Sequence, residues 1–159
     1  MKIRTFHEKD ASKVSSIIHD CFTNIDLGGH TEEGKRLQIE YNQPEILIKK
    51  SKTTKYYVAT IDETIVGICG YSGSEIRTFF VDIKYQGKGL GKALLAKIIE
   101  AAQKEGLTEL FTWSTIFAEQ FYASFGFRKI QEVLVLKNSR DIVLVEMLLN
   151  LRQLTFNIS

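Results

Sequence analysis

Apolar positions recur along this chain with two different periods, and each change of period marks a new element. Alternation with polar positions and short β-branched runs predict strands, whereas recurrence every three or four residues predicts amphipathic helices. Strands are expected at 2–6, 56–61, 64–72, 75–83, 109–114, 130–136 and 142–149, helices near 11–22, 31–41, 44–48, 90–104 and 117–125, and hairpin turns at 62–63 and 137–141.

Residues with strong preferences for helix ends support these boundaries. Asp10 and Thr31 are suitable N-caps, and Pro44 is suited to the first turn of a short helix. Gly106 and Gly126 stand where C-terminal caps belong. Apart from the short helix at Pro44, the predicted order is β-α-α-ββ-β-α-β-α-ββ.

A glycine-rich segment connects the strand at 75–83 to the helix at 90–104, with the sequence Gln86-Gly87-Lys88-Gly89-Leu90-Gly91-Lys92. The first N–H groups of a helix have no partner inside it, and the helix dipole adds partial positive charge there. Glycines allow a ligand to approach closely, and two lysines cost about 0.3–1 kcal/mol unless an anion is bound. The pattern predicts a phosphate site, but a tight connection without a ligand explains a bare G-x-G equally well.

Two commoner glycine motifs do not fit this segment. A Walker A loop requires glycine at the position of Gln86 and Ser or Thr at that of Ala93. A dinucleotide-binding fingerprint requires glycine at the position of Lys92 or of Leu94, depending on where it starts. Both motifs are therefore excluded.

Composition and charge restrict the class of protein. The 159 residues suffice for one domain, and 19 acidic residues among 21 basic ones give no reason to expect a nucleic-acid partner. No run approaches the roughly 18 apolar residues of a membrane span, so we expect no membrane partner and a cytoplasmic location. Cys21 and Cys69 are expected to be reduced packing residues, and no metal site is expected because the three histidines lack ligand spacing.

A second motif, F-Y-x-x-x-G-F at residues 121–127, follows the glycine-rich segment along the chain. Together the two motifs resemble the Gcn5-related N-acetyltransferase (GNAT) superfamily. Gln86-x-x-Gly89-x-Gly91 is similar to its acyl-coenzyme A pyrophosphate motif, Q/R-x-x-G-x-G/A, which lies between a strand and a helix. Residues 121–127, F-Y-x-x-x-G-F, are similar to its second signature, a short helix whose tyrosine points at the coenzyme sulfur. The motifs occur in the family's order.

The resemblance extends over almost the whole chain. It implies one acyl-CoA N-acyltransferase domain at 1–151, followed by a C-terminal tail at 152–159. The implied fold class is α+β in three α/β/α layers, with a mixed, mostly antiparallel central sheet that contains a splayed strand pair.

Acetyl-CoA is the co-substrate that the resemblance implies, with the glycine turn holding its diphosphate. The superfamily's central strand separates from its neighbour, here near Phe79 to Val81, so that the Val81 N–H polarises the thioester carbonyl. Thr115 stands where many members carry an asparagine that bonds the pantetheine arm, so this contact is either lost or made by the threonine hydroxyl. The expected coenzyme-binding residues are Phe79, Val81, Gln86, Gly87, Lys88, Gly89, Leu90, Gly91, Lys92 and Thr115.

Tyr122 and Glu75 are the candidate catalytic residues. The resemblance makes Tyr122 the general acid toward the leaving thiolate, although a buried tyrosine on an apolar helix is more often a packing residue. Glu75, eleven residues before Gln86, is the candidate general base, directly or through a water, as in histone-type members. A solvated strand end, or the water chain that many members use, is the alternative.

The expected function is transfer of an acetyl group directly from acetyl-CoA to a primary amine of a small molecule or peptide. The alternative is a non-catalytic acyl-CoA-binding sensor or scaffold. A homodimer through the apolar strand at 142–149 is compatible with the sequence, as is an ordinary core strand.

The amine acceptor cannot be named from the sequence. The family's acceptor pockets correspond here to residues 22–41 and 137–141. Asp26, Glu32 and Glu33 would favour a cationic amine, but the helix dipole explains an acidic first turn equally well.

Overall fold

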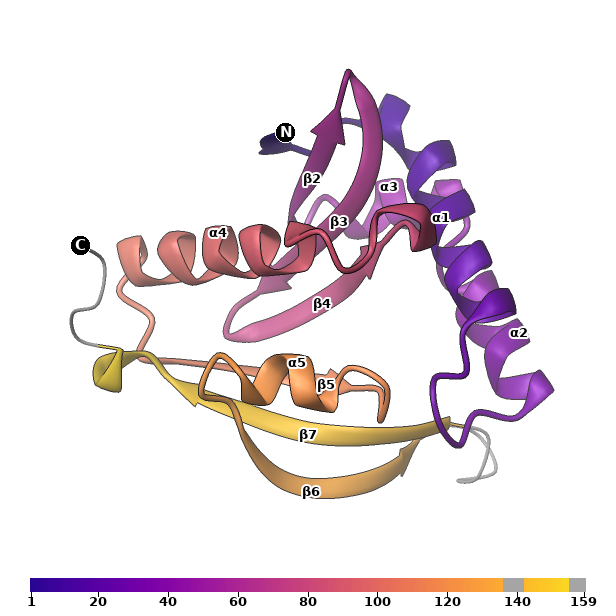
Figure 1. Ribbon diagram of the computed structural model, residues 1–159. Coiled ribbons are helices and arrows are strands. Elements are labelled where there is room, and N and C mark those ends of the chain that lie inside the picture. The colour runs from indigo at the N-terminus through magenta and orange to yellow at the C-terminus, as the bar shows by residue number, and fades with distance from the viewer. Residues whose placement is uncertain (136–141, 155–159) are drawn as a thin grey trace.

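The computed structural model describes residues 1–135 and 142–154, which form a seven-stranded sheet with helices on both faces (Figure 1). The strands are β1 (Lys2–Thr5), β2 (Lys55–Ile61), β3 (Thr64–Ser72), β4 (Glu75–Val81), β5 (Glu109–Ser114), β6 (Arg128–Val135) and β7 (Ile142–Asn150). The helices are α1 (Ala11–Asn24), α2 (Glu32–Glu40), α3 (Pro44–Lys50), α4 (Leu90–Lys104) and α5 (Glu119–Ala123). Short 3₁₀ turns lie at Glu8–Asp10, Ile83–Tyr85 and Leu151–Gln153.

The sheet is split in its middle. Its strand order is β1-β2-β3-β4-β5-β7-β6, and every neighbouring pair is antiparallel except β4 and β5. In that parallel pair only Glu75 and Ile76 are in register with Phe111 and Thr112, and the strands then diverge. This mixed, mostly antiparallel sheet with a splayed pair confirms the predicted fold class.

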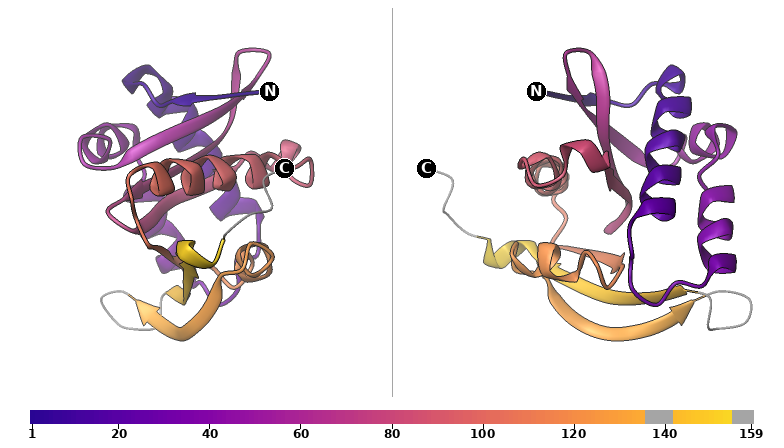
Figure 2. Two further views of the ribbon diagram at one scale, coloured as in Figure 1. Left: turned by 90° about the vertical axis from the view of Figure 1, so that its left-hand side faces the viewer. Right: turned by 45° about the vertical axis from the view of Figure 1, so that its right-hand side comes forward.

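Helices cover both faces of the sheet and complete three layers (Figure 2). α1 and α3 pack on one face around a core that includes Ile17, Leu47 and Val58, and α2 packs against α1. α4 packs on the opposite face, around a second core that includes Leu94 and Leu110. Among the described residues, no helix is both long and apolar enough to cross a membrane.

Helix α4 has the boundaries that the sequence predicts. Its apolar stripe, Leu90, Leu94, Ile98 and Ala102, is at most 2% exposed and faces the sheet. Gly106 follows the helix with φ +77°, the left-handed conformation of a glycine C-cap. The helix and the turn before it are therefore fixed to the sheet by burial of this stripe.

The other helix ends confirm two predictions and correct a third. The Thr31 hydroxyl accepts a hydrogen bond from the Gly34 N–H at 3.0 Å, and Pro44 opens α3. Asp10 makes no cap bond to α1, although it precedes that helix. Its carboxylate instead accepts from the His7 N–H at 2.8 Å and from Nη1 and Nη2 of Arg4 at 2.7 and 3.0 Å. Asp10 therefore ties β1 to the turn before α1.

We expect Asp10→Ala to lower the free energy of unfolding at pH 7 by roughly 1–3 kcal/mol, because three partly buried hydrogen bonds, two of them from the Arg4 guanidinium, are lost. Burial alone raises the pKa of this carboxyl, but the hydrogen bonds from Arg4 and His7 lower it below its ordinary value. The stabilisation is therefore present above the unfolded pKa of about 3.9 and is lost as the pH falls through the folded pKa.

Denaturant unfolding of both proteins at pH 7 and at pH 3 measures this contribution. The difference in stability between wild type and Asp10→Ala should shrink at the lower pH. Asp20→Ala, at an exposed position of α1, is the control. Equal stability of Asp10→Ala and wild type at pH 7 would contradict the assignment.

A β-bulge in β4 decides which side chains face each side of the sheet. Thr78 has φ +51°, and the register with β3 shifts between Ile68 and Gly70. The extra residue turns Phe79 toward α4 and α5, where it meets the Phe121 ring, and Phe80 toward α1. A bulge reverses the inward and outward positions that follow it.

The strand that leads to the glycine turn is shorter than predicted. β4 ends at Val81, because Asp82 begins a tight turn in which its Oδ1 accepts from the Lys84 N–H and its carbonyl accepts from the Tyr85 N–H. The predicted hairpin turn at 137–141 lies outside the described residues.

Candidate active site

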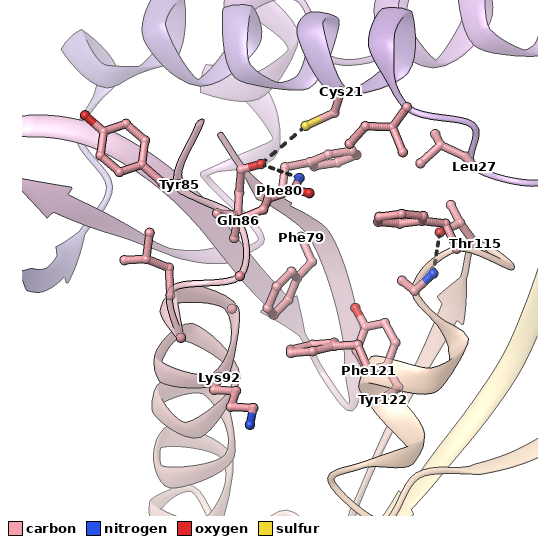
Figure 3. Close-up of a pocket in the computed structure, with 18 residues that line it drawn as sticks. Cys21, Leu27, Phe79, Phe80, Tyr85, Gln86, Lys92, Thr115, Phe121 and Tyr122 are labelled. Carbon is pink, nitrogen blue, oxygen red and sulfur yellow. Dashed lines mark hydrogen bonds between the residues drawn. The ribbon is translucent and has the colours of Figure 1, made fainter. Parts of the chain in front are cut away.

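A cavity of about 450 Å³, here called the main cleft, opens where β4 and β5 separate (Figure 3). The glycine turn with the start of α4, the segment from Thr115 to Tyr122, and α1 with its following loop supply its walls. It brings together nine of the ten predicted coenzyme-binding residues: Phe79, Val81, Gln86, Gly87, Gly89, Leu90, Gly91, Lys92 and Thr115. Lys88 is outside the lining.

The glycine turn forms an open cradle at the start of α4. Gly87 and Gly89 have φ +74° and +82°, and a Cβ at either position would meet no atom within 4 Å. The Ala93 N–H donates to the Gly89 carbonyl at 3.0 Å, so the N–H groups at the start of the helix lack an intrahelical acceptor. Diphosphate oxygens are suitable partners for such groups, and the turn therefore fits this group of the coenzyme.

The two lysines of the motif occupy different positions. Lys92 lines the main cleft from α4. Lys88 is exposed, with its Nζ 5.1 Å from the centre of the Tyr85 ring. Gly91 has a packing role, because a Cβ there would lie 3.3 Å from the Phe121 ring. Glycine at this position therefore lets α4 and α5 approach each other.

Backbone groups of β4 point into the gap of the sheet. The Asp82 N–H donates to the Val66 carbonyl of β3 at 2.8 Å. Successive residues of an antiparallel strand direct their backbone groups to opposite neighbours, so the N–H and C=O of Val81 point away from β3. Because β5 has diverged there, the Val81 N–H faces the main cleft.

The Val81 carbonyl accepts two side-chain hydrogen bonds (Figure 3). Gln86 donates through Nε2 at 3.0 Å and Cys21 through Sγ at 3.4 Å, and so the strand end, the motif and α1 are linked. Burial, together with the nearby carboxylates of Asp82 and Asp20, raises the pKa of the Cys21 thiol to about 12. The thiol is therefore protonated and unsuited to act as a nucleophile near neutral pH.

Tyr122 on α5 is buried at 4% exposure and lines the main cleft. Its ring meets Phe79 and Phe127 edge-on, with centroids 6.0 and 5.3 Å away. Burial and the nearby Cys69 raise the pKa of the phenol, and a hydrogen bond with Thr112 lowers it less. The hydroxyl therefore keeps its proton at neutral pH, which is the form that an acid requires.

Thr115 supports the turn that leads into α5. Its hydroxyl and its carbonyl both accept from the Ala118 N–H, at 3.2 and 3.1 Å (Figure 3). The hydroxyl proton remains able to donate, and Thr115 lines the main cleft. A donor therefore stands at the position where the resemblance predicts a pantetheine contact.

A second cavity of about 310 Å³ adjoins the main cleft and contains the other predicted catalytic residue, Glu75. Both Nε and Nη2 of Arg77 donate to Glu75 Oε2, at 2.8 and 2.7 Å. Glu75 does not line the main cleft, but the two cavities share five residues: Phe79, Phe80, Thr115, Ala118 and Tyr122. Tyr122 and Glu75 are thus brought to one cavity.

The region predicted to hold the acceptor contributes Phe22, His30 and Gln38 to the second cavity, whereas its other part, 137–141, lies outside the described residues. The acidic side chains considered for a cationic amine line neither cavity. The Asp26 carboxylate accepts from the Gly28 N–H, and Glu32 and Glu33 pair with Lys35 and Arg36 one helical turn later. Their positions favour the explanation from the helix dipole and local pairing.

The described residues contain no group of three or more His, Cys, Asp or Glu side chains that could hold a metal ion. The split sheet, the open glycine cradle and a protonated tyrosine in the same cleft are the features expected of the acyltransferases that the sequence resembles. The family model for the acetyltransferase (GNAT) domain matches residues 28–151, and the chain belongs to this family. The predicted family is confirmed.

Individual relatives are more distant. The N-acetylaspartate synthetase of Xenopus tropicalis is 29% identical over an alignment of 103 residues, and the match covers 59% of this chain and 38% of the relative. The chain therefore spans about two fifths of that relative's length. Among solved structures, a Gcn5-related N-acetyltransferase of Rhodopseudomonas palustris has a TM-score of 0.86 at 18% identity, with 94% of each chain covered.

Two further structures of the same fold were solved with a coenzyme. The PaiA N-acetyltransferase of Thermoplasma acidophilum, in complex with coenzyme A, has a TM-score of 0.75 at 19% identity and covers 94% of this chain and 98% of its own. The YncA protein of Salmonella typhimurium, with acetyl-CoA, has a TM-score of 0.68 at 17% identity and covers 95% and 94%. These likenesses show the fold.

The second cavity contains residues that the sequence did not single out. Lys50 is the last residue of α3, where the helix dipole is enough to explain a lysine. Arg77 lies in β4 and is exposed, as an arginine on the surface of a strand usually is. His30, one of the three histidines without ligand spacing, is half-buried in the lining. No local signal marks these residues, because elements far apart in sequence bring them together.

Proposed function

We propose that this protein transfers an acetyl group directly from acetyl-CoA to a primary amine of a small molecule or peptide. The observation that carries the proposal is the position of Tyr122, whose protonated phenol lines both cavities. A thioester in the main cleft and an amine in the second cavity would meet beside this hydroxyl. Direct transfer then requires no covalent enzyme intermediate.

The coenzyme is proposed to bind along the main cleft. N–H groups from Gln86 to Gly91 would hold the diphosphate, with Leu90 at the start of the helix and positive charge from Lys88 and Lys92. The pantetheine arm would lie in the gap beside Phe79 and Val81, and Thr115 would donate to it. The open space above Gly87 and Gly89 supports this arrangement.

Acetyl transfer needs a neutral amine, a donor to the carbonyl oxygen and a proton for the leaving thiolate. The Val81 N–H faces the cleft and is the proposed donor to the carbonyl oxygen. Tyr122 is the proposed acid toward the thiolate. Glu75, or a water held by it, is the proposed base that takes a proton from the amine, and it lines the cavity in which that amine would bind.

The second candidate function is a sensor or scaffold that binds acyl-CoA without catalysis. Thiol release from acetyl-CoA, followed with a panel of amines, separates the two. We expect release that depends on an added amine and an acetylated product in the mass spectrum. Tight binding of acetyl-CoA with no release above the buffer rate for any amine would contradict the transferase and favour the sensor.

Three further sequence predictions remain proposals. They are a domain that spans 1–151 with a tail at 152–159, a homodimer and a cytoplasmic location.

A further inference from the structure

We propose that the acceptor is a small amine that also carries an anionic group, a carboxylate or a phosphate, and that Lys50 binds this group in the second cavity. The inference rests on the proposed function and names the substrate class for the same site. It follows from the charged side chains that line this cavity, from the ion pairs and hydrogen bonds that these side chains form, and from the volume of the cavity.

Lys50 is a partly buried cation without an ion-pair partner among residues 1–135 and 142–154. Its Nζ donates to the Tyr41 carbonyl at 2.6 Å, which orients the ammonium group but leaves its charge uncompensated. Burial lowers the pKa of Lys50, and the positive charge of Arg77 lowers it further. An anion bound beside Lys50 would favour the charged ammonium form and so oppose the effects of burial and of Arg77 on its pKa.

The remaining charges of the cavity do not compensate Lys50. The carboxylate of Glu75 already accepts two hydrogen bonds from Arg77, so these two charges offset each other. Burial lowers the pKa of His30, which favours its neutral form at neutral pH. Within the described lining, Lys50 therefore leaves one unmatched positive charge, which would repel a cationic substituent and attract an anionic one.

The dimensions of the cavity favour a small molecule. Its volume of about 310 Å³ is near the lower end for small-molecule sites. Tyr122 lines one part, shared with the main cleft, and Lys50 lines another. An amine directed at Tyr122 can therefore place a second group of the same molecule toward Lys50. A small molecule in which a short linker joins an amine to an anionic group can therefore reach Tyr122 and Lys50 at the same time.

Matched pairs of acceptors test this inference, since the members of each pair differ only in their anionic groups. L-aspartate is compared with L-aspartic diamide, O-phosphoethanolamine with ethanolamine, and 1,4-diaminobutane serves as the cationic amine. We expect an anionic member to exceed its neutral partner by about tenfold or more in kcat/KM, the effect of one charge-assisted hydrogen bond. The responding pair identifies the group as a carboxylate or a phosphate.

The variant Lys50→Met should remove this preference and leave kcat/KM for the neutral partner and KM for acetyl-CoA within about twofold, because only the anion loses a charge-assisted contact. Lys50→Arg should keep the preference. Lys49→Met, an exposed position of the same helix outside the cavity lining, should behave as wild type. Thermal unfolding of each variant confirms that it is folded. Preference for neutral or cationic amines, or an equal loss by Lys50→Met for every amine, would overturn the inference.

A binding measurement separates this inference from the proposed function. L-aspartate and O-phosphoethanolamine are titrated into the coenzyme A complex by calorimetry. If no amine is acetylated but one of these anions binds and Lys50→Met abolishes binding, transfer is excluded while the anion site stands. If neither binds to the wild type, the anion site is overturned, whatever the transferase assay shows.

Discussion

Tyr122→Phe should lower kcat for acetyl transfer by roughly 10- to 1,000-fold, the usual range for loss of a general acid, while acetyl-CoA binds nearly as before. The change removes one oxygen from a buried ring and keeps the aromatic contacts with Phe79 and Phe127. Steady-state kinetics with saturating acetyl-CoA, together with calorimetry of coenzyme A binding, measures the two effects separately.

Tyr71→Phe is the matched control for this substitution. Tyr71 is also a buried tyrosine with a bonded hydroxyl, which donates to Glu105 at 2.7 Å, but it lines neither cavity. Its loss should reduce stability and leave kcat unchanged. An unchanged kcat in Tyr122→Phe would remove this phenol from the mechanism and leave it a packing residue.

Gly89→Val should weaken acetyl-CoA binding by about 100-fold, equivalent to about 2.7 kcal/mol. The valine side chain would occupy the open space above the turn, and φ +82° is unfavourable for a β-branched residue, so the N–H groups would lose their orientation. Calorimetry with acetyl-CoA measures the loss directly.

Gly106→Val separates the loss of the ligand site from strain alone. Gly106 ends the same helix with φ +77°, and a Cβ there would also meet no atom within 4 Å. Both variants should lose stability through backbone strain, but only Gly89→Val should lose affinity. Wild-type affinity in a folded Gly89→Val protein would exclude the glycine turn as the diphosphate site.

Much of this fold could be predicted because its signals are local. The buried stripe of α4, the cap at Thr31 and the glycine that follows α4 depend on residues within a few positions of one another. The glycine turn is predictable for the same reason, since the motif and the helix that it opens are contiguous. The glycine turn and the start of α4, which form one wall of the main cleft, are therefore predictable from the local sequence.

The remaining features depend on contacts between distant segments. The bulge at Thr78 is set by pairing with β3, and threonine gives no sign of a positive φ. Asp10 forms bonds with Arg4 of β1 instead of a cap, because β1 is adjacent to that turn. Lys50 and Arg77 meet in one cavity only after α3 and β4 have packed. Such tertiary contacts override local preference.

The central claim is that backbone N–H groups at the start of α4 hold the diphosphate and direct the thioester toward Tyr122. A crystal structure of the complex with coenzyme A tests it most directly. We predict diphosphate oxygens about 3 Å from backbone nitrogens of the segment Gly87 to Gly91, and the thiol beside the Tyr122 hydroxyl. A diphosphate bound elsewhere on the protein, or a thiol directed away from Tyr122, would contradict the claim.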